Sequence, residues 1–225
     1  LTDVETILSR QLRLLSDCGI QEAVITTGAF DEAVAEYCKS LELPLDISFV
    51  KNPLYDRTNY IYSIYCAREL LRDEDIVLIH GDLVFEYSVL CDVLRNSGSC
   101  MAVDCSAELP EKDFKAVVRG GMIEKVGIEF FDEAVTAQPL YKLDREDWAK
   151  WLEKMIDYCE SGDESKRKCY AENALNEIQD KDLAALDISG RLCAEIDDPD
   201  DLAAVTEKLQ KIKNRDVYMC FSTDM

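Results

Sequence analysis

A short apolar stretch at residues 76–85, broken by Gly81-Asp82, constrains the fold of this chain more than any other feature. Apolar and polar residues do not alternate in it, which predicts a buried parallel strand covered on both faces. Open α/β sheets hold their ligands at the carboxyl ends of such strands. Gly81 allows a ligand to approach the backbone there, and Asp82 offers hard oxygen ligands. The alternative is that Asp82 only caps the helix that follows.

The overall composition limits the classes of partner. The chain has 225 residues, 48% of them hydrophobic, and a formal net charge of −21. This length and hydrophobic content allow one α/β domain with a sizeable core, or two small domains. The negative charge repels nucleic-acid backbones and anionic membranes, and no apolar run approaches the roughly 20 residues of a membrane span. We therefore expect neither a nucleic-acid nor a membrane partner.

Ten cysteines are distributed through helix-like and strand-like segments. They form no C-x-x-C motif, and the sequence shows no signal peptide, so a disulfide scaffold is not expected. This pattern predicts reduced, mostly buried thiols and a cytoplasmic location.

Helix-like and strand-like segments alternate through the first half of the chain. Apolar side chains recur at helical spacing, and short β-branched runs lie between the helical segments. Repeated units of this kind predict an α/β fold with a mostly parallel central sheet and helices on both faces, which makes three layers. The expected helices are 5–18, 31–41, 59–71 and 86–95, and the expected strands are 23–27, 47–50, 76–85 and 100–103.

After Asp104 the pattern changes to a smaller subregion with a hairpin and helices. Residues 114–118 and 122–126 flank Arg119-Gly120-Gly121, which is typical of a β-hairpin with a glycine-containing turn. The apolar residues 217–221 have the character of a strand, either an edge strand of the same domain or the first strand of a further one. The other expected elements are helices at 143–158 and 170–178, a solvated loop at 161–168, strands at 183–188 and 192–196, and a helix that starts at Pro199.

A second acidic residue, Asp197, closes an expected strand just as Asp82 does. Two carboxylates that converge on one point bind Mg²⁺ and hold phosphates against it. The neighbouring Asp198, Asp200 and Asp201 are explained by their place at the start of a helix, where the dipole favours negative charge. The pair Asp82 and Asp197 is therefore the candidate metal site.

The polar segment 51–63 leads from a strand into a helix and is a third candidate region. Thr58 or Asn59 suits the N-cap of that helix. Asn59 and Ser63 lie one helical turn apart and would share a face that points toward the strand ends. They are candidates for contact with a ligand at that edge of the sheet.

The remaining reactive and aromatic side chains narrow the choice of chemistry. His80 is the only histidine, and its place at the end of a buried strand favours packing over a role as general base. No combination of histidine with serine or cysteine suggests a catalytic triad, which argues against acyl transfer. Trp148 and Trp151 are three residues apart, a spacing typical of a helix core, although an aromatic surface would also suit a cationic substrate group.

Taken in order, these segments resemble the nucleotidyltransferase superfamily, and within it the phosphocholine and 2-aminoethylphosphonate cytidylyltransferases. The resemblance runs over nearly the whole chain. It rests on Arg10-Gln11-Leu12 with Gly19-Ile20, on Asn52-x-x-Tyr55-x-x-x-Asn59-x-x-x-Ser63, on Gly81-Asp82, on Glu172-Asn173-Ala174-Leu175-Asn176 and on Glu195-Ile196-Asp197.

The resemblance implies a Rossmann-like fold whose hairpin and helices bind the acceptor. The implied reaction is an in-line attack of a substrate phosphate or phosphonate on the α-phosphorus of CTP, with pyrophosphate leaving. Asp82 and Asp197 would be catalytic by holding Mg²⁺. Lys115 would meet the anionic group of the acceptor, or be an ordinary lysine at a strand edge. The implied nucleotide-binding residues are Asn59, Ser63, Gly81 and Asp82, and the implied acceptor-binding residues are Tyr55, Lys115, Tyr141 and Glu172.

The resemblance also suggests how the chain is organised. In the family a strand, a Gly-rich loop with a basic residue and a Pro-Lys segment precede the first helix, whereas this sequence opens at Leu1-Thr2-Asp3-Val4. We expect a nucleotidyltransferase domain at 1–214 without that strand and loop, and a tail or the start of a further domain at 215–225. Such a further domain occurs in fused phosphonate-biosynthesis enzymes, which favours a phosphonate acceptor.

Several alternatives stay open at this point. The acceptor could be phosphocholine or a sugar 1-phosphate instead of a phosphonate. The chain could also be a non-catalytic nucleotide-binding domain of a larger protein, which the missing loop favours. A homo-oligomer is compatible with every one of these functions.

Overall fold

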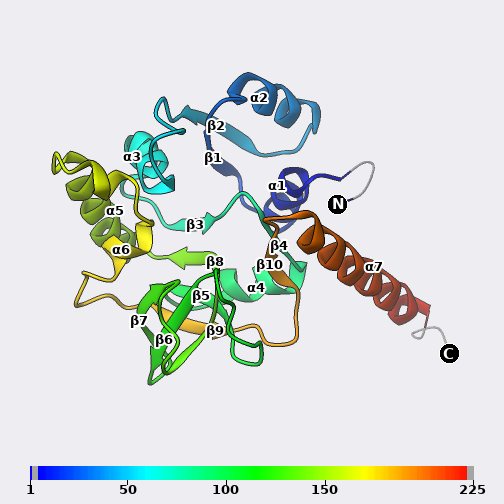
Figure 1. Ribbon diagram of the computed structural model, residues 1–225. Helices are drawn as coiled ribbons and strands as arrows, with labels where there is room; N and C mark the ends of the chain where they lie inside the picture. Colours follow the sequence, from blue (N-terminus) through cyan, green and yellow to red (C-terminus); the bar gives the residue numbers. More distant parts are fainter. Residues whose placement is uncertain (2–4, 222–225) are drawn as a thin grey trace.

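The computed structural model describes residue 1 and residues 5–221, with side chains described up to residue 212 (Figure 1). The helices are α1 (Ile7–Asp17), α2 (Asp31–Ser40), α3 (Tyr60–Leu71), α4 (Tyr87–Arg95), α5 (Arg145–Glu160), α6 (Ala171–Leu175) and α7 (Pro199–Phe221), with a 3-10 turn η1 (Glu164–Arg167). The strands are β1 (Glu22–Thr27), β2 (Asp46–Lys51), β3 (Ile76–Ile79), β4 (Leu83–Phe85), β5 (Cys100–Asp104), β6 (Lys115–Arg119), β7 (Met122–Gly127), β8 (Ala134–Leu143), β9 (Ala184–Asp187) and β10 (Cys193–Glu195).

A six-stranded sheet forms the centre of the molecule. Its strand order is β3-β8-β5-β9-β7-β6, and β6 also pairs with β8, so that part of the sheet closes on itself. Among the described strands of this sheet, only β5 and β9 pair in parallel, and the other pairs are antiparallel. The sheet is therefore mixed, and the prediction of a mostly parallel central sheet is wrong for it.

The long strand β8 explains much of this difference. It pairs antiparallel with β3, β5 and β6, and no strand was expected in this part of the chain. Pro139 lies within β8, and a proline lacks the amide hydrogen that a central strand uses, which hides the strand in the sequence. The carbonyl oxygen of Pro139 accepts a hydrogen bond from the amide of His80 at 3.2 Å.

The apolar stretch at residues 76–85 forms two strands rather than one. β3 ends just before His80-Gly81-Asp82, as the sequence suggested, but it is only partly buried and pairs antiparallel with β8. β4 is fully buried and pairs antiparallel with β10. The expected parallel strand covered on both faces is therefore wrong. The turn between the two strands instead joins two different sheets.

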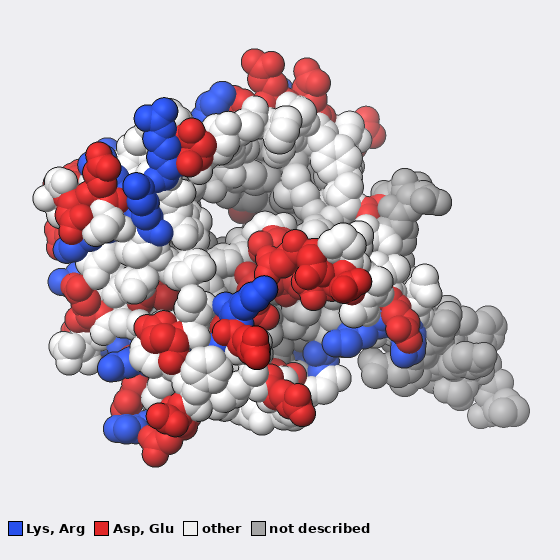
Figure 2. Space-filling view, viewed as in Figure 1, with Lys and Arg blue, Asp and Glu red and all other residues white. Residues whose placement is uncertain are grey.

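The parallel pair β1–β2 lies apart from the central sheet, together with α2 and α3 at the top of Figure 1. In the described part of the chain, β1 pairs with β2 alone and β3 pairs with β8 alone. Figure 2 shows a hollow where β1 and β3 face each other in Figure 1. β1 confirms the strand expected at 23–27, and β3 is the first part of the stretch expected as one strand at 76–85, but the two do not belong to one sheet.

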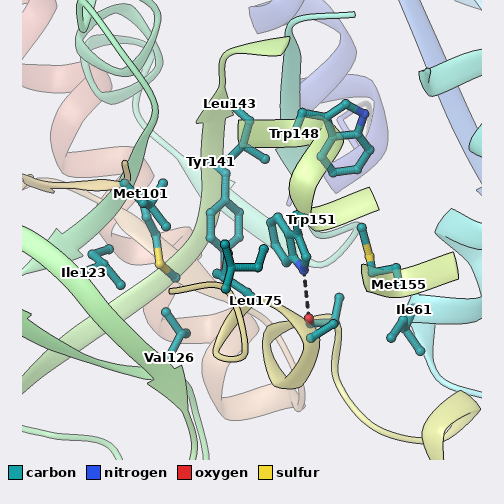
Figure 3. Close-up of a cluster of buried hydrophobic side chains, with 14 of the residues drawn as sticks. Ile61, Met101, Ile123, Val126, Tyr141, Leu143, Trp148, Trp151, Met155 and Leu175 are labelled. Carbon is teal, nitrogen blue, oxygen red and sulfur yellow. Dashed lines mark hydrogen bonds between the residues drawn. The ribbon is translucent and has the colours of Figure 1, made fainter. Parts of the chain in front are cut away.

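The main core lies between the central sheet and α5 (Figure 3). Trp148 and Trp151 are fully buried in it, and the ring of Tyr141 meets that of Trp151 edge to face with centroids 5.3 Å apart. Each indole finds an acceptor, because Trp148 Nε1 donates to the Leu71 carbonyl at 2.7 Å and Trp151 Nε1 to the Ala171 carbonyl at 2.9 Å. The interpretation of the two tryptophans as core residues is confirmed.

Most of the other predicted helices and strands are present. The hairpin β6–β7 and the helices through the start of α7 lie close to their predicted positions. The strand expected at 217–221 is wrong, because α7 continues to Phe221, and residues 222–225 lie outside the described part. The division into a domain at 1–214 and a tail stays a prediction.

Two global features concern the thiols and the membrane. All nine cysteines that the structure describes are free thiols. Four of them are buried, and Cys105 is exposed. None of the helices in the described residues has the length and apolar character needed to cross a bilayer.

Candidate active site

The two acidic segments singled out in the sequence lie side by side. β4 begins just after Asp82 and β10 ends at Glu195, and the two strands pair antiparallel with Glu195 opposite Leu83. The amide of Ile196 donates a hydrogen bond to the carbonyl oxygen of Asp82, 3.1 Å away. The backbone itself therefore brings residues 195–197 to Asp82.

Three side chains of this junction form one group, namely His80, Asp82 and Glu195. Each offers a potential ligand atom, and these atoms all lie within 4.8 Å of one another. His80 Nδ1 and Glu195 Oε1 are 3.1 Å apart, while His80 Nε2 and Asp82 Oδ1 are buried without a hydrogen-bond partner. A buried polar atom left without a partner costs about 1–3 kcal/mol. The group is therefore incomplete by itself, and a bound cation would complete it.

Helix α1 positions the backbone of this group. Gln11 Nε2 donates to the carbonyl oxygen of His80 at 2.8 Å and to that of Leu83 at 2.7 Å. Arg10 Nη2 donates to the carbonyl oxygen of Phe85 at 3.1 Å. These bonds hold the turn between β3 and β4 in place.

Negative charge prevails around the group. Burial raises the pKa of Glu195, its contact with His80 opposes this, and the charges of Asp82 and Asp113 raise the pKa further. Burial lowers the pKa of His80, but the bond to Glu195 and the charge of Glu172 outweigh it, so that the net shift is upward. Figure 2 shows acidic side chains gathered near the place where β10 and α7 meet in Figure 1. Such an excess of carboxylates attracts a divalent cation.

Asp197, the predicted second metal ligand, is exposed at this junction. Its amide donates to Asp201 Oδ2 at 3.2 Å. The pKa of Asp113 is raised, first by partial burial and next by the charges of Asp197 and Asp201. Asp197 therefore belongs to the same acidic region. Within the described residues, however, the group that could hold a metal contains Glu195 and not Asp197. The pair Asp82 and Asp197 stays a prediction.

Glu172 forms a second, deeply buried network. Its side chain is 1% exposed, and it accepts hydrogen bonds from the hydroxyl of Tyr60 and, at 2.7 Å, from that of Tyr141. The pKa of both tyrosines is raised well above the usual value, first by burial and next by the charge of Glu172. Both hydroxyls therefore keep their protons and donate hydrogen bonds. Among the described residues, no ion pair involves Glu172.

A cavity of about 320 Å³ opens beside Glu172. Phe114 and Tyr170 line it, with their ring centroids 5.0 Å apart. Asn59 and Lys168 contribute polar groups to its wall. Aromatic rings together with a carboxylate are the groups that bind an organic ammonium ion. The cavity therefore combines aromatic rings with a buried carboxylate, the groups that suit a small cation, and it also has Lys168 in its wall.

Tyr60 connects the cavity with the acidic group. Its ring meets that of His80 edge to face with centroids 4.6 Å apart, and its hydroxyl bonds to Glu172. Phe114, on the cavity wall, has its ring centroid 6.1 Å from that of His80. A ligand in the cavity would therefore lie close to the group of His80, Asp82 and Glu195.

The residues predicted to bind the nucleotide have structural partners. Asn59 is the N-cap of α3, as one interpretation predicted, because its Oδ1 accepts from the amide of Tyr60 at 2.7 Å. Ser63 Oγ accepts from Asn52 Nδ2 at 3.0 Å. Gly81 is exposed, and a Cβ there would meet nothing within 4 Å. Their contact with a nucleotide stays a prediction.

Two residues predicted to bind the acceptor lie in unexpected surroundings. Lys115 is fully buried, and its Nζ donates to the carbonyl oxygens of Pro110 at 2.6 Å and Asp113 at 2.9 Å. Its ammonium group is thus already engaged by the backbone, and it is not an exposed edge lysine. Tyr55 is 48% exposed and packs on Gly28, where a Cβ would lie 2.9 Å from Tyr55 Cγ. Neither residue lines the cavity.

Sequence reasoning missed four residues of this site, namely His80 as a partner of Asp82, Glu195, and the cavity residues Phe114 and Tyr170. A signal existed for Glu195, which precedes Asp197 by two, since residues two apart on an extended chain point to the same side. His80 and Asp82 lie in the turn between β3 and β4, where this rule does not apply. The aromatic pair comes from segments far apart in the sequence, and no spacing could have joined them.

Comparison with solved structures identifies the fold. The inositol-1-phosphate CTP transferase from T. maritima is 20% identical to the chain and has a TM-score of 0.75. The superposition covers 95% of this chain and 85% of that protein. The CTP:phosphocholine cytidylyltransferase from Streptococcus pneumoniae is 18% identical and has a TM-score of 0.70. The superposition covers 93% of this chain and 87% of that protein. The chain has the nucleotidyltransferase fold.

Sequence relatives also include cytidylyltransferases. CMP-5'-(3-aminopropyl)phosphonate synthase from Streptomyces rubellomurinus is 40% identical over 84 residues, which are 37% of this chain. CTP:phosphoglutamine cytidylyltransferase from Campylobacter jejuni is 21% identical over 84 residues, which are 35% of this chain. The matched segments are 13% and 32% of these two relatives, so the chain spans only part of their length. No protein-family model matches the chain. The resemblance to the nucleotidyltransferase superfamily is confirmed.

Proposed function

We propose that the chain is a Mg²⁺-dependent cytidylyltransferase, which transfers CMP from CTP to a small aminoalkylphosphonate such as 2-aminoethylphosphonate and releases pyrophosphate. The observation that carries the proposal is the buried carboxylate of Glu172 beside an aromatic cavity that adjoins the acidic strand ends. The similarity to CMP-5'-(3-aminopropyl)phosphonate synthase supports an acceptor of the same class.

The cavity suits the amine of such an acceptor. Glu172 and the rings of Phe114 and Tyr170 would hold an ammonium group there. The phosphonate would then point past Tyr60 toward Asp82, because the Tyr60 ring lies between Glu172 and His80. This orientation aims the nucleophilic oxygen at the acidic end of the site.

The acidic end suits a magnesium ion. Asp82, whose buried Oδ1 has no partner, and the exposed Asp197 are the residues that would hold it. When bound, the ion would neutralise charge on the phosphate oxygens. The carboxylates of this region would otherwise repel CTP and the phosphonate.

The chain itself would act mainly by positioning. The turn that α1 holds fixes Asp82, and Glu172 orients the acceptor, so that attack and departure are in line. Gly81, which precedes Asp82, and Asn59 and Ser63, which lie at the start of α3, remain the residues proposed for the nucleotide.

A pyrophosphate assay with matched acceptors tests the proposal. The longest available form of the protein is incubated with CTP and Mg²⁺, and with 2-aminoethylphosphonate, ethylphosphonate, phosphocholine or glucose 1-phosphate. We expect turnover with 2-aminoethylphosphonate and much less with ethylphosphonate, which lacks only the amine. Pyrophosphate release only with phosphocholine or only with glucose 1-phosphate would identify that compound as the acceptor instead.

No release with any acceptor would overturn the enzymatic function. Calorimetry with CTP and Mg²⁺ then decides whether the chain is a nucleotide-binding domain without catalysis. Metal-dependent binding of CTP would favour that class.

A further inference from the structure

We propose that His80 joins Asp82 in one metal centre, with Glu195 as its partner, and that this centre prefers a first-row transition ion such as Mn²⁺ or Co²⁺ to Mg²⁺. The inference deepens the proposed function and rests on it only for the assignment of Asp82 to a metal. Its test measures metal binding directly, without substrates.

The geometry of the three side chains supports a shared centre. The potential ligand atoms of His80, Asp82 and Glu195 all lie within 4.8 Å of one another, so His80 and Asp82 are close enough to share one cation while Glu195 contacts the histidine. The three residues come from the β3–β4 turn and from β10, which pair through backbone hydrogen bonds. The site is therefore preformed by the fold. Two protein ligands, His80 and Asp82, would leave coordination positions free for water or phosphate oxygens.

Two polar atoms of the group lack a hydrogen-bond partner. Asp82 Oδ1 and His80 Nε2 are both buried, and neither has a hydrogen-bond partner. Two such atoms in one group call for an explanation in a folded protein. One cation accounts for both, because a carboxylate oxygen and an imidazole nitrogen are each metal ligands.

Contacts with Glu195 and Tyr60 orient the histidine. Glu195 Oε1 lies 3.1 Å from His80 Nδ1 and would accept its proton. That arrangement leaves the lone pair on Nε2, as in a carboxylate–histidine–metal triad. The His80 ring is also held by the edge-to-face contact with Tyr60 at 4.6 Å. The imidazole is therefore oriented before any ion binds.

The charge around the group favours a cation over a water molecule. Asp113 and Glu172 add negative charge to that of Asp82 and Glu195. The nearby ammonium of Lys115 is turned to backbone carbonyl oxygens. A water molecule would satisfy hydrogen bonds but would add no positive charge to the group.

The donor set selects the kind of ion. Mg²⁺ prefers an octahedral shell of oxygen atoms, most of them from water and phosphate. Imidazole favours first-row transition ions over Mg²⁺. A mixed nitrogen and oxygen set therefore predicts that Mn²⁺ or Co²⁺ binds more tightly than Mg²⁺.

The test uses Mn²⁺ alone as the probe. Electron paramagnetic resonance counts the ions bound, and electron spin-echo spectroscopy detects nitrogen coupled to the bound Mn²⁺. We expect one tight Mn²⁺ per chain with imidazole nitrogen coupling, at least about tenfold tighter than Mg²⁺ in competition. His80→Asn should remove the nitrogen coupling and weaken Mn²⁺ at least about tenfold.

The matched control is Asp200→Asn, and Glu195→Gln tests the partner of His80. Asp200 is exposed in the same acidic segment, so Asp200→Asn should leave Mn²⁺ affinity unchanged. Glu195→Gln should weaken Mn²⁺ and keep the nitrogen coupling. Bound Mn²⁺ without nitrogen coupling in the unaltered chain overturns the inference, even if the variants fail to fold. Equal affinity for Mn²⁺ and Mg²⁺ overturns it as well.

The outcome is distinguishable from that of the proposed function. Nitrogen-coupled Mn²⁺ without pyrophosphate release supports the metal centre and removes the catalytic proposal. Turnover with Mg²⁺ and no nitrogen coupling supports the catalytic proposal and removes His80 from the metal centre.

Discussion

The amide of Ile196 donates a hydrogen bond to the carbonyl oxygen of Asp82 at 3.1 Å. It extends the pairing of β4 with β10, in which Cys193 lies opposite Phe85. Backbone bonds therefore place the acidic side chains of this junction, and contacts among the side chains are not needed. Variants that neutralise one of these acids should keep the fold, so a loss of activity in them reports on chemistry.

We expect Asp82→Asn to lower kcat/KM for pyrophosphate release by at least about 100-fold, because it removes a charge that holds the metal against the phosphates. Its melting temperature should stay within a few degrees of the parent value, since the buried Oδ1 of Asp82 has no hydrogen bond to lose. The assay is pyrophosphate release, with circular dichroism for stability. Asp200→Asn is the control and should remain active. An active Asp82→Asn would remove this residue from the site.

Asp197→Ala and Glu195→Gln together test which acid is the partner of Asp82. The sequence favours Asp197, whereas the geometry brings Glu195 to within 4.8 Å of Asp82. We expect Asp197→Ala to abolish turnover and to keep the fold, because this side chain is exposed. Full activity in Asp197→Ala, with loss in Glu195→Gln, would transfer the catalytic role to Glu195. Parallel thermal melts show whether either loss is one of folding.

The order of helices and strands was largely predictable because it depends on local periodicity and on helix ends. Asn59 illustrates this, since an asparagine before an apolar helical run caps α3 as predicted. The pairing of strands was not predictable in the same way. β8 contains Pro139 and lies antiparallel to β3, and neither fact can be inferred from an apolar run at residues 76–85.

The candidate site was predictable in part for the same reason. Asp82 follows an apolar strand and stands out in the sequence. The fit of Glu172 between Tyr60 and Tyr141 depends on tertiary packing of α6 against α3 and β8. Lys115 shows the reverse case, because it was expected to meet the acceptor or to lie at a strand edge, whereas its ammonium group is buried against carbonyl oxygens.

The thiols should react in an order set by burial and by pKa. Burial raises the pKa of Cys100 to about 11 and that of Cys159 to about 12, and both side chains are fully buried. At pH 8 the thiolate fraction of Cys100 is therefore only about 0.1%. Burial also raises the pKa of Cys105, but this side chain is exposed.

We therefore expect iodoacetamide at pH 8 to modify Cys105 well before Cys100 and Cys159, as measured by peptide mass spectrometry. Labelling in urea is the control and should make the three thiols comparable. Equal rates in the folded protein would contradict the buried positions of Cys100 and Cys159.

Glu172→Gln should act on the acceptor and not on CTP. The substitution keeps the shape of the side chain and an oxygen that can accept from Tyr60 or Tyr141, but it removes the negative charge beside the cavity. A charge-assisted hydrogen bond to an ammonium group contributes about 1.5–3 kcal/mol, which corresponds to about 10- to 100-fold in affinity. We expect the KM for 2-aminoethylphosphonate to rise by that factor, with the KM for CTP unchanged.

The matched acceptor separates this effect from a general loss of structure. Ethylphosphonate has no amine, so its slow turnover should be the same in Glu172→Gln and in the parent chain. Tyr141→Phe is the second control, because it removes one hydroxyl from Glu172 and keeps the carboxylate. It should cost about 1–3 kcal/mol in the free energy of unfolding, measured with urea, and should change the KM for 2-aminoethylphosphonate much less than Glu172→Gln does. Equal losses for both acceptors in Glu172→Gln would place the amine elsewhere, since the charge of Glu172 would then serve the fold and not the substrate.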